Sequence, residues 1–448
     1  MNIYVVQPGD TVNSIADKFN LPYEKIVHDN NISPDYGIVN GQIIILAYPT
    51  RTYKVQPDDT LKSIADANGI SIIQLLRNNP SLSDRDYLNI GEELIISYDR
   101  REEPIEVNTY CFSFINDDIL KKTLPYLTYI TIANYRVTAY AKIESPDDTF
   151  IIQTAKEYGV APIIMISSSS EQGRGSFGIT HKILNDPDLQ NELIYNILYY
   201  LREKGLYGIN FGFVQIIPED LQSYVNLIIQ TTEILHSEGY QVHVTLVPNT
   251  FGFKADQTND NPYYSQVGQV ADRLILLSYT WATADIYAFE QTTNPFLESY
   301  IQYAVTQIPA EKILLGYTRI AYDWELPYVE GESPVTALAN YQALALANQI
   351  GIDLGFDEYH VTPYFRYYTD GIEHFVWFKD ARSLDAELAL INKYNLRGIS
   401  IWNTMDFTPQ LWVTINSQYN ISKVLKCNIG TFDITYIYGN GHRYHVLR

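Results

Sequence analysis

The segment of residues 208–214, GINFGFV, places three side chains where a strand could carry out acid chemistry. Its alternate residues Asn210, Gly212 and Val214 face the same side if the segment is extended. Two carboxylates at such positions can protonate a leaving group and stabilise a developing positive charge. Glycine and valine can do neither, and Asn210 offers only a neutral amide. This face of the segment therefore carries no acid.

Seven other apolar segments have a similar length and composition, and amphipathic stretches such as NELIYNILYYLREKG separate most of them. The eight strand-like segments are residues 108–114, 129–135, 161–167, 208–214, 241–247, 273–279, 312–318 and 398–404. Eight strands alternating with helices predict an α/β fold of the closed (β/α)8 TIM barrel type. An open doubly wound sheet is the alternative, but no glycine-rich phosphate loop follows the first strand.

Aromatic residues gather at the expected carboxyl ends of these strands. Tyr279, Trp281, Tyr317 and Trp402 all lie there. Working residues of a TIM barrel come from these ends, and an aromatic ring with a polar tip suits the face and hydroxyls of a sugar. Each ring alone is more often a packing residue, but several together indicate a binding site.

A long interval separates the seventh and eighth strand-like segments. It contains YFRYYT and HFVWF on either side of Asp370-Gly371, which is a hairpin signal. We expect a small α+β insertion over about residues 320–385, beside the barrel mouth. A C-terminal β extension is expected over residues 426–448, where alternating aromatic and apolar residues precede Gly-Asn-Gly.

The composition limits the partners. With 52 acidic and 31 basic residues among 448, the net charge is −21, which argues against nucleic acid or anionic membranes as main partners. The cysteines are Cys111 and Cys427, and no histidine spacing fits a metal site, so we expect neither a metal nor a cofactor. We predict no membrane span and no secretory signal.

Two copies of one pattern open the chain: YVVQPGDTVNSIADKFNLPYEKIVHDNNI and YKVQPDDTLKSIADANGISIIQLLRNNPSL. Tyr4 matches Tyr53, and residues 14–17 (SIAD) recur as residues 63–66. Each copy reads as strand, helix, helix, strand, with a closing strand after a glycine turn. The expected repeats cover residues 1–48 and 51–98.

The pattern VQPGDT…SIA…NN…GQ.I.I resembles the LysM domain. This resemblance implies binding of glycans that contain N-acetylglucosamine, such as peptidoglycan or chitin, in a groove between the loop after the first strand and the loop before the last. The second copy has Asp58 in place of Gly9, which makes its groove the less certain one. The implied glycan-binding residues are Pro8, Gly9, Asp10, Thr11, Ile38, Asn40, Pro57, Asp58, Asp59, Thr60, Leu88 and Asn89.

The charged stretch of residues 97–107, SYDRREEPIEV, reads as a linker or a domain boundary. Residues 105–425 resemble glycoside hydrolase family 18, and within it the LysM-bearing, spore cortex-lytic N-acetylglucosaminidases. The matching stretches include YITIANYRVTAYAKI, ILNDPDLQNELIYNIL and YDWELPYV. The order of two LysM repeats before a barrel fits the same proteins.

The resemblance implies substrate-assisted catalysis, in which the N-acetyl oxygen of the sugar attacks its own anomeric carbon. An aspartate and a glutamate two residues apart serve that reaction, and their positions here are Gly212 and Val214. Loss of a general acid lowers a rate on the order of 10²–10⁴-fold. Glu219 and Asp220 follow the strand, but we interpret them as surface or helix-capping residues rather than a relocated acid.

Other family positions keep suitable side chains. The resemblance implies that they bind sugar within the barrel: Tyr279, Trp281, Asp323, Trp324, Arg366 and Trp402. The Gly-Pro-rich loop that follows the sixth strand in this family is replaced here by WATADIYAF, which alters the groove.

Three functions remain open from the sequence. The favoured one is a catalytically inactive family member that binds peptidoglycan at the spore or cell wall. The second is an N-acetylglucosaminidase, active on cortex peptidoglycan through a relocated acid. The third is a structural component that docks spore coat proteins. The expected location is the spore coat or cortex surface, reached from the mother-cell cytoplasm without a signal peptide.

Overall fold

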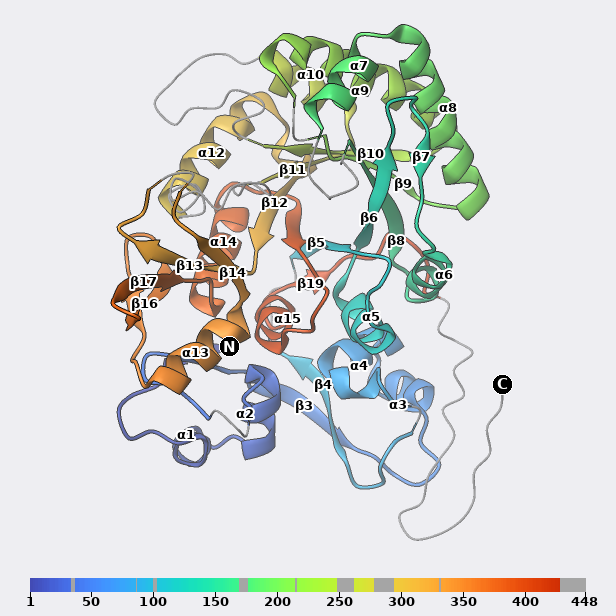
Figure 1. Cartoon of the computed structure of the whole chain (residues 1–448). Helices are drawn as coiled ribbons and strands as arrows, with labels where there is room; N and C mark the ends of the chain where they lie inside the picture. Colours follow the sequence, from blue (N-terminus) through green and yellow to red (C-terminus); the bar gives the residue numbers. More distant parts are fainter. Residues whose placement is uncertain are drawn as a thin grey trace.

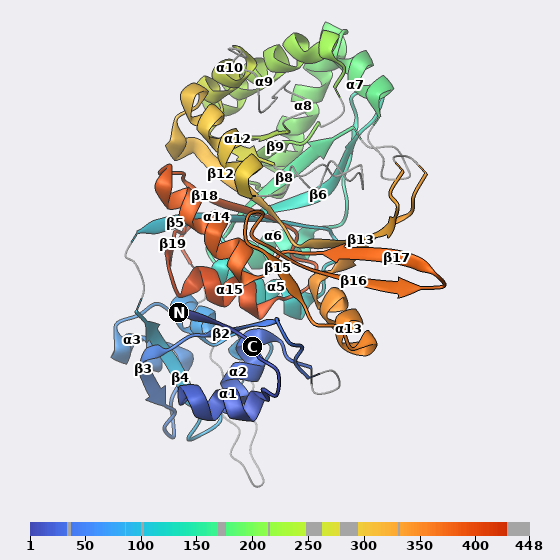
Figure 2. The same cartoon turned by 90° about the vertical axis from the view of Figure 1, so that its left-hand side faces the viewer.

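The computed structural model describes residues 1–33, 37–85, 87–99, 103–168, 176–213, 216–247, 262–277, 294–329 and 332–427. Two small repeats lie against a closed barrel, and an antiparallel lobe stands beside it (Figure 1). Seen from the side, the strands of this lobe project away from the barrel (Figure 2). Val214, Tyr279, Trp281 and residues 428–448 lie outside the described residues.

Both repeats have the predicted strand–helix–helix–strand order. The first consists of β1 (Asn2–Val5), α1 (Val12–Phe19), α2 (Tyr23–Asn30) and β2 (Ile43–Leu46). The second consists of β3 (Pro49–Lys54), α3 (Leu61–Asn68), α4 (Ile72–Asn78), a 3-10 turn (Pro80–Leu82) and β4 (Glu93–Tyr98). The first and last strands of each repeat pair antiparallel. Thr11 and Thr60 cap α1 and α3, because each hydroxyl accepts a bond from the serine amide three residues later.

Eight parallel strands form the barrel: β5 (Pro104–Cys111), β6 (Tyr129–Val137), β8 (Ala161–Ser167), β9 (Gly208–Phe211), β10 (Gln241–Leu246), β11 (Arg273–Leu276), β12 (Ile313–Thr318) and β18 (Gly398–Trp402). Pairing of β5 with β6 closes the ring, since β5 also pairs with β18. The predicted (β/α)8 barrel is therefore confirmed, and the open sheet is wrong. Short strands β7 (Ile143–Glu144) and β19 (Asn420–Ile421) extend the sheet beside β6 and β5.

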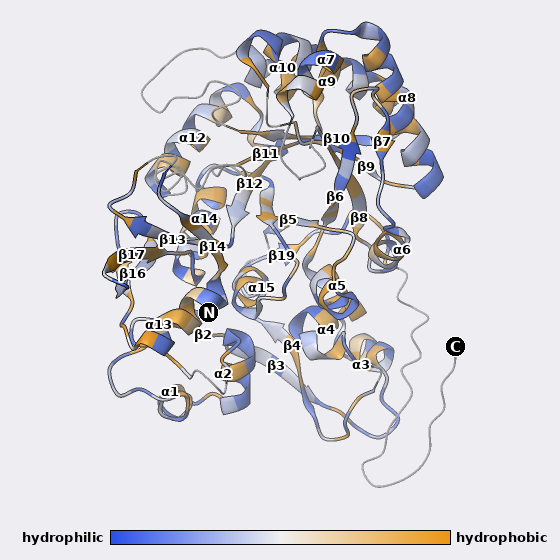
Figure 3. Cartoon of the chain, in the orientation of Figure 1, coloured by the Kyte–Doolittle hydropathy of each residue, from blue (hydrophilic) through white to orange (hydrophobic). Residues whose placement is uncertain are grey.

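Helices surround this ring: α5 (Asp117–Thr123), α6 (Thr149–Glu157), α7 (Phe177–Leu184), α8 (Pro187–Lys204), α9 (Leu221–Ser237), α10 (Pro262–Val270), α12 (Asn294–Gln307), α14 (Ala381–Lys393) and α15 (Pro409–Asn416). Helical 3-10 turns cover Leu124–Tyr126, Pro218–Asp220 and Ala310–Lys312. Hydrophobic and hydrophilic residues alternate along the outer helices (Figure 3). In α8, for example, Leu193, Ile197 and Leu201 are buried, which is the spacing of one helix face.

The insertion forms a lobe of five antiparallel strands and one helix. Its members are β13 (Ile320–Leu326), β14 (Val335–Ala339), α13 (Asn340–Ile350), β15 (Gly355–Asp357), β16 (Thr362–Thr369) and β17 (Ile372–Trp377). The hairpin predicted at Asp370-Gly371 is confirmed, because Thr369 pairs with Ile372 across two residues with positive φ.

The expected linker over residues 97–107 is wrong in part. Strand β4 continues to Tyr98 and β5 begins at Pro104, so only a short connection remains. Glu106 made this stretch look solvated, but its carboxylate is buried and accepts bonds from Arg273 at 2.6 Å and Arg397 at 2.7 Å. These guanidiniums lower the pKa of Glu106 against the effect of burial. The charge is therefore compatible with a barrel strand.

Candidate functional site

Asn210 lies inside the barrel within a neutral hydrogen-bond network. Its amide donates to the Tyr110 hydroxyl at 3.0 Å, and the Thr245 hydroxyl donates to its oxygen at 2.9 Å. All three side chains are buried. Burial raises the pKa of Tyr110 to about 12, so this hydroxyl stays protonated at neutral pH. The network binds the ends of β5, β9 and β10 together without any charge.

The space beside Gly212 is filled by Met165 from β8. A Cβ atom on Gly212 would lie 2.7 Å from Met165 Cγ and 2.9 Å from its sulfur. Met165 is itself buried in a small cluster with Tyr110 and Ile275. A side chain at position 212 would therefore need the flexible end of Met165 to shift. Position 212 thus carries no side chain, and Met165 lies close against it.

The two acids after β9 face other partners. Glu219 is exposed on the 3-10 turn. Asp220 is buried, and its carboxylate lies 2.8 Å from His181 Nδ1 and accepts a bond from the Asn185 amide at 2.7 Å. Its partners belong to α7 and the residue that ends this helix. Glu219 is a surface residue as expected, whereas Asp220 is buried and its side chain makes no cap bond to α9, so the interpretation of Asp220 as a surface or helix-capping residue is wrong.

Trp402 belongs to an aromatic run that leads from the barrel interior to the surface. Its ring lies 5.1 Å from the Tyr110 ring and 5.9 Å from Phe112, which stacks on Phe114 at 5.5 Å. Phe114 is 72% exposed. Phe112 and Phe114 were not among the predicted site residues; they follow β5 in a turn, where the Ile115 amide donates to the Phe112 carbonyl at 3.0 Å. Tyr317, in contrast, is buried with its ring 5.2 Å from the Lys379 ammonium.

A cavity of about 300 Å³ adjoins Trp402, and the first repeat, the barrel and the lobe line it. Asn31 comes from the first repeat, Trp402 from β18, Arg319 from the junction of β12 and β13, and Tyr341 from the lobe helix. Arg319 is held by Asp406, with Nη2 to Oδ1 at 2.6 Å. The space next to the predicted sugar floor is thus shaped by how the repeat and the lobe dock.

The lobe residues of the predicted sugar site point in different directions. Asp323 accepts from Tyr367 at 2.7 Å and lies 2.9 Å from His374 Nδ1. Trp324, its neighbour on β13, faces the opposite side, where it is 1% exposed and stacks on Trp377 at 5.7 Å. Arg366 pairs with Glu373 at 2.8 Å. The Arg366 guanidinium also lies 4.7 Å from the Phe375 ring, which stacks on Trp324 at 6.2 Å. Trp324 and Arg366 therefore share one face of the lobe sheet, and Asp323 lies on the other.

The predicted glycan loops have the same internal bonds in both repeats. Asp10 accepts from the Tyr4 hydroxyl at 2.6 Å, and Asp59 accepts from Tyr53 at 2.9 Å. Pro8 and Pro57 are exposed. Asp58 has φ +69°, so it keeps the left-handed conformation that Gly9 has at φ +90°. The substitution that made the second groove less certain leaves the turn intact.

The loops before the last strands are arranged differently. Ile38 packs on the small core of the first repeat, whereas Leu88 is buried in the second. The Asn40 amide donates to Asp353 of the lobe at 3.0 Å. Asn89 is exposed, and its amide lies 3.5 Å from Glu92 of its own repeat.

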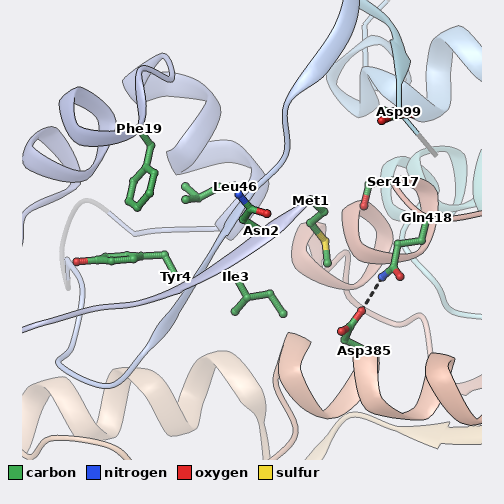
Figure 4. Close-up of a pocket in the computed structure, with 10 residues that line it drawn as sticks. All are labelled: Met1, Asn2, Ile3, Tyr4, Phe19, Leu46, Asp99, Asp385, Ser417 and Gln418. Atoms are coloured by element: carbon green, nitrogen blue, oxygen red, sulfur yellow. Dashed lines mark hydrogen bonds between the residues drawn. The ribbon is translucent and has the colours of Figure 1, made fainter. Parts of the chain in front are cut away.

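A wide groove of about 920 Å³ runs between the first repeat and helices α14 and α15. Figure 4 shows Tyr4 and Phe19 on the repeat side, with Asp385 bonded to Gln418 on the barrel side at 2.9 Å. Of the predicted barrel-site residues that the structure describes, none lines it. Docking of the repeat creates this groove, not the strand ends of the barrel.

Comparison with known families accounts for most of the chain. Residues 106–406 match the glycosyl hydrolases family 18, and residues 4–47 and 53–97 match the LysM domain. The chain belongs to glycosyl hydrolase family 18. It carries two LysM domains before the family-18 barrel.

Three relatives match nearly the whole family-18 chain. It is 30% identical over 432 residues to the cortical fragment-lytic enzyme of Bacillus subtilis (strain 168), covering 94% of this chain and 99% of that protein. It is 26% identical over 435 residues to the putative sporulation-specific glycosylase YdhD of the same organism, covering 95% and 100%. The crystal structure of the Bacillus cereus spore cortex-lytic enzyme SleL is similar with a TM-score of 0.74, at 28% identity and with 94% and 99% of the two chains covered.

No group of three or more His, Cys, Asp or Glu side chains in the described part of this family-18 chain is arranged to hold a metal ion. Among the helices that the structure describes, none is long and apolar enough to cross a membrane.

Proposed function

We propose that this protein binds N-acetylglucosamine-containing glycan of the spore cortex or cell wall, and that its family-18 barrel no longer hydrolyses it. The LysM domains and the names of the relatives support the glycan class. The relatives are named as lytic enzymes, and this chain would differ from them in that its barrel does not hydrolyse the glycan. Its location at the spore cortex rests on the same relatives.

The observation that carries the proposal is the pairing of Gly212 with Met165. Position 212 has no carboxylate, and Met165 atoms fill the space beside it. Position 214 is a valine, which cannot donate a proton. Without a general acid and a group that stabilises the acetamide-derived cation, two separate contributions to the rate are lost. Trp402 keeps an aromatic surface on which a sugar ring can stack.

Digestion of purified cortex fragments tests the loss of catalysis. The wild-type chain should release no new reducing ends, and it should still sediment with the fragments. We expect Gly212→Asp with Val214→Glu to restore part of the cleavage, because Met165 must turn aside for the new carboxylate. Adding Met165→Ala should increase the restored rate, with Met165→Ala alone as the inactive control.

Cleavage by the wild-type chain that Glu219→Gln abolishes would contradict the proposal and favour a relocated acid. Binding of the chain to coat extract, with no retention on cortex fragments, would favour a structural role with spore coat proteins as partners. The domain limits, with repeats over 1–48 and 51–98 and a barrel over 105–425, set where truncations should be made.

A further inference from the structure

The turn before the last strand of the first repeat is bound by the insertion lobe. The Asn40 side-chain amide donates to the Asp353 carboxylate at 3.0 Å, and the Leu354 backbone amide donates to the Asn40 carbonyl at 2.9 Å. Asn40 thus gives both a side-chain donor and a backbone acceptor to the segment between α13 and β15. A ligand that needed these groups would have to displace two hydrogen bonds.

The contact between the turn and the lobe is also close. Gly41 has φ +80°, and a Cβ atom there would lie 2.3 Å from the Leu354 carbonyl oxygen. Val39 is buried in a cluster with Ala347 and Phe378 of the lobe region. Only a glycine lets the two backbones approach this closely. The turn therefore combines polar, apolar and steric complementarity with the lobe.

The matching turn of the second repeat makes no such contact within the described residues. Gly91 has nearly the same φ, +86°, but a Cβ there would meet only Lys54 Cε, at 3.6 Å, which belongs to its own repeat. Ile90 is 45% exposed and Asn89 is exposed as well. The opposite rim, from Gln56 to Thr60, has the same turn as residues 7–11 in the first repeat. The two grooves differ at one rim only.

We propose that the repeats have divided roles, an inference that rests on the proposed glycan binding. The second repeat takes the N-acetylglucosamine glycan between residues 56–60 and 88–91. The turn at residues 38–41 of the first repeat is instead a clasp that holds the lobe next to Trp402. The occupant of this clasp is the Asp353-Leu354 segment of the same chain. The sequence predicts two glycan sites, but in this proposal the second repeat is the glycan site and the first repeat anchors the lobe.

Matched substitutions in the full-length chain test the division. Pro8→Trp and Pro57→Trp place the same bulky ring at exposed, equivalent positions, and binding of a tetramer of N-acetylglucosamine is measured by calorimetry. We expect Pro57→Trp to weaken binding at least tenfold and Pro8→Trp to change it less than twofold. Equal losses, a larger loss for Pro8→Trp, or no loss in either variant would overturn the inference alone. A wild-type chain that binds neither the tetramer nor cortex fragments would overturn the proposed function with it.

Hydrogen exchange tests the clasp independently of any glycan. The Leu354 amide should be protected in the full-length chain, and Asp353→Ala should speed its exchange at least tenfold. Asn89→Ala, in the matching turn of the second repeat, should leave exchange in residues 352–357 unchanged. A Leu354 amide that exchanges freely in the wild-type chain would overturn the clasp.

Discussion

The two LysM repeats have matching internal bonds and different surroundings. In each, an asparagine at the end of the second helical segment fixes the last strand: Ile45 donates to the Asn30 oxygen at 2.6 Å, and Ile95 donates to the Asn79 oxygen at 2.8 Å. The second repeat shares one continuous hydrophobic core with the barrel, which includes Ile64, whereas Ile15 belongs to a separate cluster of the first repeat. Two copies of one fold are thus attached to the barrel in different ways.

The polar contacts of the repeats with the barrel follow the same division. In the second repeat, buried Arg77 donates to the Pro125 carbonyl at 2.9 Å, and Asn78 accepts from Asn416 at 2.9 Å. In the first repeat, Gln410 of α15 donates to Asn30 at 3.0 Å, and the Asn40 turn holds the lobe. The neighbours of a repeat, and not its own sequence pattern, therefore decide whether its groove is free.

The largest expected difference comes from the repeat cores. Ile15 and Ile64 occupy equivalent positions and are both fully buried. Replacing either with alanine should destabilise its own repeat by about 2–5 kcal/mol. Ile64→Ala should lower the main unfolding transition, because its repeat shares the barrel core, while Ile15→Ala should produce a separate transition at lower temperature. Scanning calorimetry distinguishes these results, and equal shifts of one transition would remove the distinction.

A smaller difference is expected at the two turn glycines. Gly91→Ala should cost about 1–2 kcal/mol, because alanine is strained at this positive φ. Gly41→Ala has the same strain and also meets the Leu354 oxygen, so about 1–3 kcal/mol more should be lost. Urea unfolding of the two variants measures both values. Equal losses would mean that the first turn is not pressed against the lobe.

The smallest effect concerns the acids of the first turns. The Tyr4 hydroxyl, followed by the Gln7 amide, lowers the pKa of Asp10, while the Asp59 carboxylate raises the pKa of Tyr53. Because the pKa of Asp10 is lower in the folded state, its carboxylate stabilises the fold at pH values above the unfolded-state pKa. This stabilisation is lost as the pH falls through the folded-state pKa. Because the pKa of Tyr53 is higher in the folded state, its protonated hydroxyl stabilises the fold at pH values below the unfolded-state pKa. This stabilisation is lost as the pH rises through the folded-state pKa.

Carbon NMR titration follows each group. Tyr4→Phe should raise the pKa of Asp10, and Asp59→Asn should lower the pKa of Tyr53. Unchanged values in these variants would show that the phenol–carboxylate bonds do not exist in solution.

Much of the fold could be predicted because its signals are local. The barrel strands are short apolar runs, the repeats have helix caps at Thr11 and Thr60, and the hairpin has Asp370-Gly371. The start of β5 was missed because Glu106 looks like a linker residue until Arg273 and Arg397 surround it. The sugar-binding set stays a prediction: the structure buries its member Trp324 in the lobe and places Phe112, which the set did not include, against Trp402.

The sequence by itself determined that positions 212 and 214 carry no acid, since glycine and valine side chains can hold no proton in any fold. It also determined the repeats and the barrel, because the spacing of apolar residues close together in the chain distinguishes helices from strands. Only the tertiary structure decided that Met165 fills the space beside Gly212 and that Asn40, rather than Asn89, is held by the lobe. Both are contacts between residues far apart in the chain, and no local pattern records which backbones will meet.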